Sequence, residues 1–272
     1  MKKHNISEIE RIRHKYNYDA DEPTGWITIN GARVPLDEEG NAYGPVIDKI
    51  NSYNSANVVK EKWGISISNE SIKNVTDRQS LNSALETIDK VLSKAGFTEG
   101  TEVITGIQIR NSEGSAGSVK TDGEGGIVID NALINNGYDN SEQIEHVIKE
   151  AGGVTRGAGV NTLIGEAVGR SALDYISAES GESIKDIAHK VVEEGFARSV
   201  NGQNVPVSTA HDALMTISSR AAKTGPYHDN YTNAVIDAFA DVAANGDGAK
   251  KLSQYIVSDG MSKVLKDYDL TW

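Results

Sequence analysis

Hydrophobic positions recur with helical spacing through the second half of the chain. In residues 81–95 they fall at intervals of three and four, and Gly96 follows where such a helix would end. The same spacing predicts helices at about 161–177, 183–199, 208–223 and 230–244, with one or two more before residue 272. From residue 140 onward the chain is therefore predicted to be almost wholly helical.

Alternation of hydrophobic and polar residues predicts short strands in the first half. Residues 26–36 contain two alternating arms around Asn30-Gly31, a pair that favours a two-residue hairpin turn. Shorter strands are predicted at 118–121 and 127–129, and one strand face is predicted to carry Val103, Thr105, Ile107 and Ile109. The order is hairpin, helix, small sheet and then helices. It predicts an α+β fold with a small antiparallel sheet and a mostly helical C-terminal half.

The first part of the chain is set apart by its composition. Residues 1–22 are predicted to form a short charged helix followed by an acidic linker, and a helical stretch ends near Trp63. We therefore expect an N-terminal segment of helix and hairpin at 1–64 and an α+β domain at 65–272.

Composition narrows the classes of function. The chain has 39 acidic and 27 basic residues, a formal net charge of −12 and no cysteine. Disulfides, thiolate metal sites and cysteine nucleophiles are thereby excluded. Direct nucleic-acid binding is not expected, because it needs a basic surface. No run of about 18 apolar residues occurs and the N-terminus has no apolar core, so we expect a cytoplasmic protein without a membrane partner.

The segment from 140 to 153 carries the candidate chemistry. Asn140 and Gln143 have the spacing of a helix capping box, and a core stripe is predicted to consist of Ile144, Val147, Ile148 and Ala151. The opposite side, facing solvent or a cleft, is predicted to carry His146, Lys149, Glu150 and Gly153. Residues four apart share a helix face, which is how the two histidines of an HExxH helix grip one zinc ion.

Three segments resemble the zincin-like, metallopeptidase-type domains of phage head-morphogenesis and related mobile-element proteins. The first is GWITINGARVPLDEEG at 25–40, which is similar to a hairpin common in such phage proteins. The second is GGIVIDNALI followed by SEQIEHVIKEAGG, which has the layout of an edge strand leading into an HExxH helix. The third is NAVIDAFADVAANG at 233–246, which is similar to the stretch that supplies the glutamate ligand.

The resemblance implies a site that has lost its metal. Glu150 matches the general base, but Lys149 and Gly153 stand at the two histidine positions, and neither residue offers a lone pair to zinc. Asp237 matches the third ligand, and Asn233 lies one turn earlier where a glutamate would be expected. Because a zinc site needs about three protein ligands, the resemblance implies a vestigial Glu150 and no zinc or other cofactor. It thus implies a non-catalytic protein that acts by binding a protein partner in a bacterial or phage-infected cell.

Two other functions stay open. His146 with Glu150, His189 with Glu193, and Asp237 with Asp241 are each four residues apart, so a metal-dependent hydrolase could use displaced ligands at His146, Glu150, His189 and Asp237. The competing interpretation is that these are solvated residues opposite apolar stripes. The net charge alone motivates the other alternative, an acidic inhibitor of a host nucleic-acid-binding protein.

A bridge from Lys149 to Glu150 and Asp237 would replace the metal by a salt bridge, and Lys149→Ala would then destabilise the fold.

Overall fold

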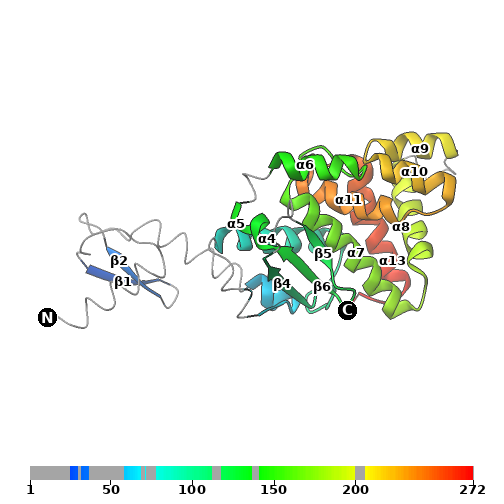
Figure 1. Cartoon of the computed structure of the whole chain (residues 1–272). Coiled ribbons are helices and arrows are strands. Elements are labelled where there is room, and N and C mark those ends of the chain that lie inside the picture. The colour runs from blue at the N-terminus through cyan, green and yellow to red at the C-terminus, as the bar shows by residue number, and fades with distance from the viewer. Residues whose placement is uncertain are drawn as a thin grey trace. The chain divides into compact units, whose positions relative to one another are not determined.

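A computed structural model of the chain describes residues 25–29, 32–36, 58–68, 71, 78–111, 118–136, 141–199 and 206–271 (Figure 1). The chain divides into two compact units, Met1–Val58 and Val59–Trp272. The helix and linker predicted at 1–22 and the turn residues Asn30 and Gly31 lie outside the described residues, as does Asn140 of the predicted capping box.

The described part of the first unit is a β-hairpin. Strand β1 (Gly25–Ile29) pairs antiparallel with β2 (Ala32–Leu36), and the register runs from Gly25 opposite Leu36 to Ile29 opposite Ala32. Two residues separate the strands, which confirms the hairpin predicted around Asn30-Gly31.

The second unit contains a small sheet and a series of helices. Residues 58–63 are helical. The elements that follow are β3 (Ser66–Ile67), α4 (Arg78–Ala95), β4 (Gly106–Arg110), β5 (Val119–Thr121), β6 (Gly126–Asp130), α5 (Asn131–Asn136), α6 (Ser141–Glu150), α7 (Val160–Ser180), α8 (Ile184–Ser199), α9 (Val207–Met215), α10 (Ser219–His228), α11 (Thr232–Asn245), the 3₁₀ turn η1 (Gly246–Gly248), α12 (Lys251–Tyr255), the π-helix η2 (Ile256–Gly260) and α13 (Met261–Asp267). The α+β class is confirmed.

The sheet is mixed, so the prediction of an antiparallel sheet was wrong. Its strand order is β3-β4-β6-β5, with β4 parallel to both β3 and β6, and only β5 and β6 are antiparallel. The reason is connectivity: α4 carries the chain back between β3 and β4, and β6 inserts between β4 and its own hairpin partner β5. The predicted strand face is also shorter than expected, since β4 begins at Gly106 and Thr105 is exposed.

The buried side of the sheet and the face of α4 follow the predicted pattern. Four isoleucines of β4 and β6 are at most 2% exposed: Ile107, Ile109, Ile127 and Ile129. On α4 the predicted stripe from Leu81 to Ala95 is buried, and Gly96 adopts a φ of +85° directly after the helix. Glycine tolerates this left-handed conformation, so it ends the helix where the sequence indicated.

Helix α11 is the centre of the helical part. It contacts α4, α7, α8, α10 and α12, and its residues from Ala234 to Val242 are all buried. Its closest neighbour is α7 (Figure 1), and Gly165 and Gly169 of α7 face it. A Cβ atom at Gly165 would lie 2.7 Å from Ala240 Cα, and one at Gly169 would lie 2.9 Å from Phe239 Cβ. These two glycines therefore let the helices approach closely, and they bring Glu166 to the side of α11.

The remaining helices agree with the predictions except at one position. The predicted helix 208–223 is broken into α9 and α10 by the residues between Met215 and Ser219. On α8 the apolar face that begins at Ile184 is buried from Ile187 onward, through Ala188, Val191 and Val192, while Ile184 is half-buried. Within the described ranges, no helix combines the length and the apolar character that crossing a membrane would need.

Candidate functional site

Helix α6 carries the near match to a zinc-peptidase helix, and it ends before that motif is complete. Its last residue is Glu150, and Gly152 follows with a φ of +71°. The N–H of Gly152 donates to the carbonyl of Lys149 at 3.0 Å, and that of Gly153 donates to the carbonyl of Ile148 at 2.9 Å. This is the Schellman pattern of a glycine-terminated helix. Gly153 therefore lies in the turn beyond the helix.

More of α6 is exposed than the predicted four-residue core stripe implies. Ile144 and Ile148 are buried, but Val147 is 45% exposed and Ala151 is exposed. The predicted four-residue stripe was thus half right, because the helix meets the rest of the unit along a narrow edge.

The three chemically interesting residues of α6 lie in solvent. Lys149 is exposed, and the side chains of His146 and Glu150 are 69% and 71% exposed. Nε2 of His146 lies 3.3 Å from a carboxylate oxygen of Glu150. The pair is a surface contact within one helix, of the kind that contributes little to stability.

The turn after α6 docks on the beginning of α10. The carbonyl of Gly152 accepts the backbone N–H of Arg220 at 2.9 Å and the hydroxyl of Ser219 at 3.3 Å. A Cβ atom at Gly153 would lie 3.2 Å from a carboxylate oxygen of Glu166. The place where the second histidine would stand is therefore occupied by a close contact between this turn and α7.

Ser218 makes α10 begin where it does. Its backbone is extended, and its hydroxyl accepts the N–H of Ala221 at 3.0 Å, which is an N-cap interaction. The same hydroxyl donates to Oδ2 of Asp237. The cap thus also links the start of α10 to the middle of α11.

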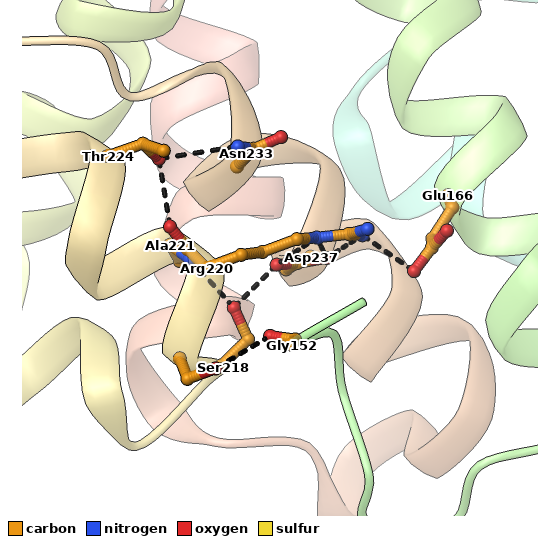
Figure 2. A network of polar contacts seen from close by, with 9 residues as sticks. Gly152, Glu166, Ser218, Arg220, Ala221, Thr224, Asn233 and Asp237 are labelled. Atoms are coloured by element: carbon orange, nitrogen blue, oxygen red, sulfur yellow. Dashed lines mark hydrogen bonds and ion pairs between the residues drawn. The ribbon is translucent and has the colours of Figure 1, made fainter. Parts of the chain in front are cut away.

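Arg220 is the centre of a cluster of buried charges (Figure 2). Its Nε lies 3.0 and 2.9 Å from the two oxygens of Asp237, and its Nη2 contacts Oδ1 of the same carboxylate. Nη2 also donates to Glu166 at 2.6 Å. Asp237 is fully buried, whereas the side chains of Arg220 and Glu166 are 22% and 23% exposed. One guanidinium is therefore shared by two carboxylates, and the three charges sum to −1 when all are ionised.

A second layer of hydrogen bonds holds this part of α10. The hydroxyl of Thr224 donates to the carbonyl of Arg220 at 2.9 Å and accepts from Nδ2 of Asn233 at 3.3 Å (Figure 2). Asn233, one turn before Asp237, thus bonds to α10 and positions the arginine's helix.

Burial shifts the pKa values of the cluster. It raises the pKa of Asp237 above its ordinary value, against the opposing effects of Arg220 and Ser218. Burial likewise raises the pKa of Glu166, which Arg220 counters and the charge of Asp237 reinforces. Burial acts to lower the pKa of Arg220, but its bonds and charge contacts with Asp237 and Glu166 outweigh this and raise it. The arginine is therefore a permanent cation, and the two carboxylates are the groups that respond to pH.

Asp241, one turn after Asp237, has a separate set of partners. Its carboxylate accepts Nδ2 of Asn245 and the backbone N–H of Lys250, each at 2.8 Å. Nη2 of Arg156 lies 3.5 Å away and also contacts the carbonyl of Gly248. Arg156 thus links the loop after α6 both to Asp241 of α11 and to Gly248 of η1.

The residues of the alternative metal site lie in three different environments. His146 and Glu150 are on the surface of α6, and Asp237 is buried against Arg220. The side chain of His189 on α8 lies 3.5 Å from Glu193 and 3.4 Å from Asp229, which follows α10. In the described ranges, no three histidine, aspartate or glutamate side chains are arranged to hold a metal ion.

Sequence reasoning missed four residues of this site: Glu166, Ser218, Arg220 and Arg156. Two of them left a signal. Ser218 is a favourable N-cap residue inside the helix predicted at 208–223. Glu166 follows Gly165 in a Gly-x-x-x-Gly pattern that marks a close helix crossing. Nothing near Arg156 or Arg220 in the sequence indicates which carboxylate each would meet.

Comparison of the chain with models of protein families, with curated proteins and with solved structures found no match. Ideas about function therefore depend on the motifs of the sequence and on this site.

Proposed function

We propose that the chain is a non-catalytic binding protein on a scaffold similar to zincin-like, metallopeptidase-type domains, with a protein partner and a phage or mobile-element origin. The observation that carries the proposal is the environment of Asp237, the residue at the third ligand position. Arg220 contacts both of its oxygens and Ser218 donates to one of them. A cation of the protein itself thus takes the lone pairs that a metal would need.

The surroundings of Gly153 support the same proposal. Gly153 stands at the second histidine position, and its neighbour Glu166 bonds to the same guanidinium that holds Asp237. The third-ligand position, Asp237, therefore contacts Arg220 directly, and the second histidine position, Gly153, lies next to the other carboxylate that binds Arg220. A metal ion at this place would meet the like charge of Arg220 at close range, which is strongly unfavourable in a partly buried environment.

Glu150 fits a vestigial role in this proposal. A general base has to come within hydrogen-bond reach of the water or substrate that it activates. Its side chain is 71% exposed and lies against His146 on the outer side of α6, while the cluster lies beyond the end of that helix.

A peptidase assay tests the non-catalytic part. The purified full chain would be incubated with casein and with a fluorogenic peptide library, with and without added zinc, beside Glu150→Gln. We expect no cleavage above that of the variant. Cleavage that depends on zinc and is abolished in Glu150→Gln would overturn the proposal and support the hydrolase with displaced ligands.

Affinity capture tests the binding part. The full chain would serve as bait in a bacterial lysate, and each captured protein would be purified and titrated against it. We expect a partner whose affinity is the same for the wild type and Glu150→Gln, and the same with a metal chelator. Loss of binding with the chelator would contradict a metal-free binding role. A nucleic-acid-binding partner released by DNA would instead favour the acidic inhibitor that the charge of −12 motivates.

A further inference from the structure

A groove of about 260 Å³ lies between α8 and the C-terminal helices of the second unit. Helix α8 contributes Glu194 and Arg198, and α13 contributes Lys263 and Lys266. Between them, the π-helix η2 contributes Ser258 and Asp259. These residues are not part of the arginine cluster described above.

Two glycines explain why a π-helix can form the wall of this groove. A Cβ atom at Gly260 of η2 would lie 2.3 Å from the carbonyl oxygen of Val191 on α8. One at Gly195 of α8 would lie 2.7 Å from Ile256 Cγ1. The backbones of α8 and η2 are therefore in direct contact next to the residues that line the groove. Isolated π-turns within helices are rare and occur frequently at functional sites.

The acidic side chains of the groove are less exposed than the basic ones. The acidic side chains are the less exposed ones, Glu194 at 29% and Asp259 at 31%. Both lie near Nε of Arg198, at 3.5 and 3.2 Å, and Asp259 also accepts the hydroxyl of Ser258 at 2.7 Å. The acidic groups are thus already partnered inside the groove.

The cationic side chains form its rim. Arg198 is 59% exposed, Lys263 is 52% exposed, and Lys266 is exposed. Lys263 is paired with Asp267 on the same helix. Within the part of the chain that the structure describes, Lys266 has no carboxylate at ion-pair distance and Arg198 makes no hydrogen bond. Arg198 and Lys266 therefore have donors available to a ligand.

We propose that this groove binds a small oxyanion, a ligand that carries phosphate or carboxylate groups. A guanidinium can grip such a group with two parallel N–H donors, and a neighbouring ammonium adds a point charge. Lys263 is paired with Asp267 and Nε of Arg198 lies near two carboxylates, so Lys266 is the rim cation that has no ion-pair partner among the described residues. The volume lies slightly below the range for drug-sized ligands, which suits a compact polyanion.

Calorimetric titration of the full chain with pyrophosphate, and separately with citrate, tests the proposal at constant ionic strength. We expect saturable binding of at least one of them with a Kd below about 1 mM. Arg198→Gln combined with Lys266→Gln should weaken it at least about tenfold. The matched control is Lys120→Gln with Lys223→Gln, which removes the same charge from exposed lysines on β5 and α10 and should change the Kd less than about twofold.

Two results would overturn the proposal. One is the absence of saturation for both anions up to about 10 mM. The other is equal weakening in the rim and control pairs, which would mean that only overall charge matters. Circular dichroism checks that the variants fold. If the variant that carries Arg198→Gln does not fold, Lys266→Gln alone, at an exposed position, still tests the rim.

Discussion

Asp237 and Asp241 lie one turn apart on α11, both are at most 1% exposed, and each faces a different arginine. Asp237 holds Arg220 at the start of α10, and Asp241 lies near Arg156 in the loop after α6. A central helix that is buried along nine residues would not retain two carboxylates without such partners, because an unpaired buried charge is costly. The two aspartates therefore fasten the surrounding segments to α11.

Removal of Arg220 should be strongly destabilising. In Arg220→Met the volume is largely kept, but Asp237 stays buried without its cation and Glu166 loses its nearest one. We expect the free energy of unfolding to fall by about 3–5 kcal/mol, measured by urea denaturation at pH 7. The control is Lys223→Met, which removes the same charge from an exposed position of the same helix and should stay within about 0.5 kcal/mol.

A triple variant separates the loss of a partner from the loss of packing. Replacement of the whole cluster by Glu166→Leu, Arg220→Met and Asp237→Leu leaves no charge unpaired, and apolar replacement of buried ion pairs is often neutral. It should therefore be more stable than Arg220→Met alone. If it is less stable, the cluster stabilises the fold by more than charge compensation.

The stability of the protein should depend on pH through Glu166. Burial raises its pKa in the folded state above the ordinary value of 4.5, so the folded state binds a proton more readily than the unfolded state. The stabilising effect of that proton is fully present below pH 4.5. It is lost as the pH rises through the folded pKa, by at most about 1.4 kcal/mol per pH unit.

Glu166→Gln tests this dependence, because the amide does not ionise. Between about pH 4.5 and 7 we expect the wild type to lose stability relative to the variant, as followed by urea denaturation at several pH values. If the stability of the variant still falls with rising pH, we attribute that remaining dependence to Asp237, because burial raises the pKa of Asp237 as well. The control Glu150→Gln, at an exposed site, should run parallel to the wild type. A parallel course of Glu166→Gln would contradict the prediction.

The sequence predicted local elements better than their connections. Periodicity identified α4, α7, α8 and α11, because one-sided burial leaves a regular pattern, as from Leu81 to Ala95. It did not reveal that β6 inserts between β4 and β5, since strand order depends on contacts between distant residues. The break at Ser218 was missed because the apolar spacing continues across it.

The candidate site was predictable only in part. Asp237 was selected from its motif, and in the structure it is fully buried and in contact with Arg220. Its partner Arg220 lies 17 residues earlier and could not be chosen among the other basic residues, because long-range ion pairs have no sequence spacing. Gly153 stands at a histidine position of the motif. In the structure it follows Gly152, which ends α6, and it lies close to Glu166.

Lys149→Ala should have almost no effect on stability. A salt bridge from Lys149 to Glu150 and Asp237 would have made the residue important, but the partner of Asp237 is Arg220 and Lys149 is exposed. We expect a change within about 0.5 kcal/mol in urea denaturation. A loss above about 2 kcal/mol would mean that Lys149 reaches a buried carboxylate in solution. Lys185→Ala removes an exposed lysine of α8 near Asp229. Its effect shows how much a surface ion pair contributes to the free energy of unfolding.

The turn after α6 should be much less tolerant of a side chain than Gly181, the glycine that ends α7. Gly152 and Gly181 have φ values of +71° and +73°, so alanine is equally strained at both. At Gly181 a Cβ atom would meet nothing within 4 Å, but at Gly152 it would lie 2.7 Å from the hydroxyl of Ser219 and 3.4 Å from the backbone of Arg220.

The difference between the two alanine variants therefore measures the docking of this turn on α10. We expect Gly181→Ala to cost about 1 kcal/mol from backbone strain, and Gly152→Ala to cost at least about 1 kcal/mol more from overpacking. Thermal and urea unfolding would compare the two. Equal losses would mean that Ser219 moves aside freely, and that the turn is not held against the helix that carries Arg220.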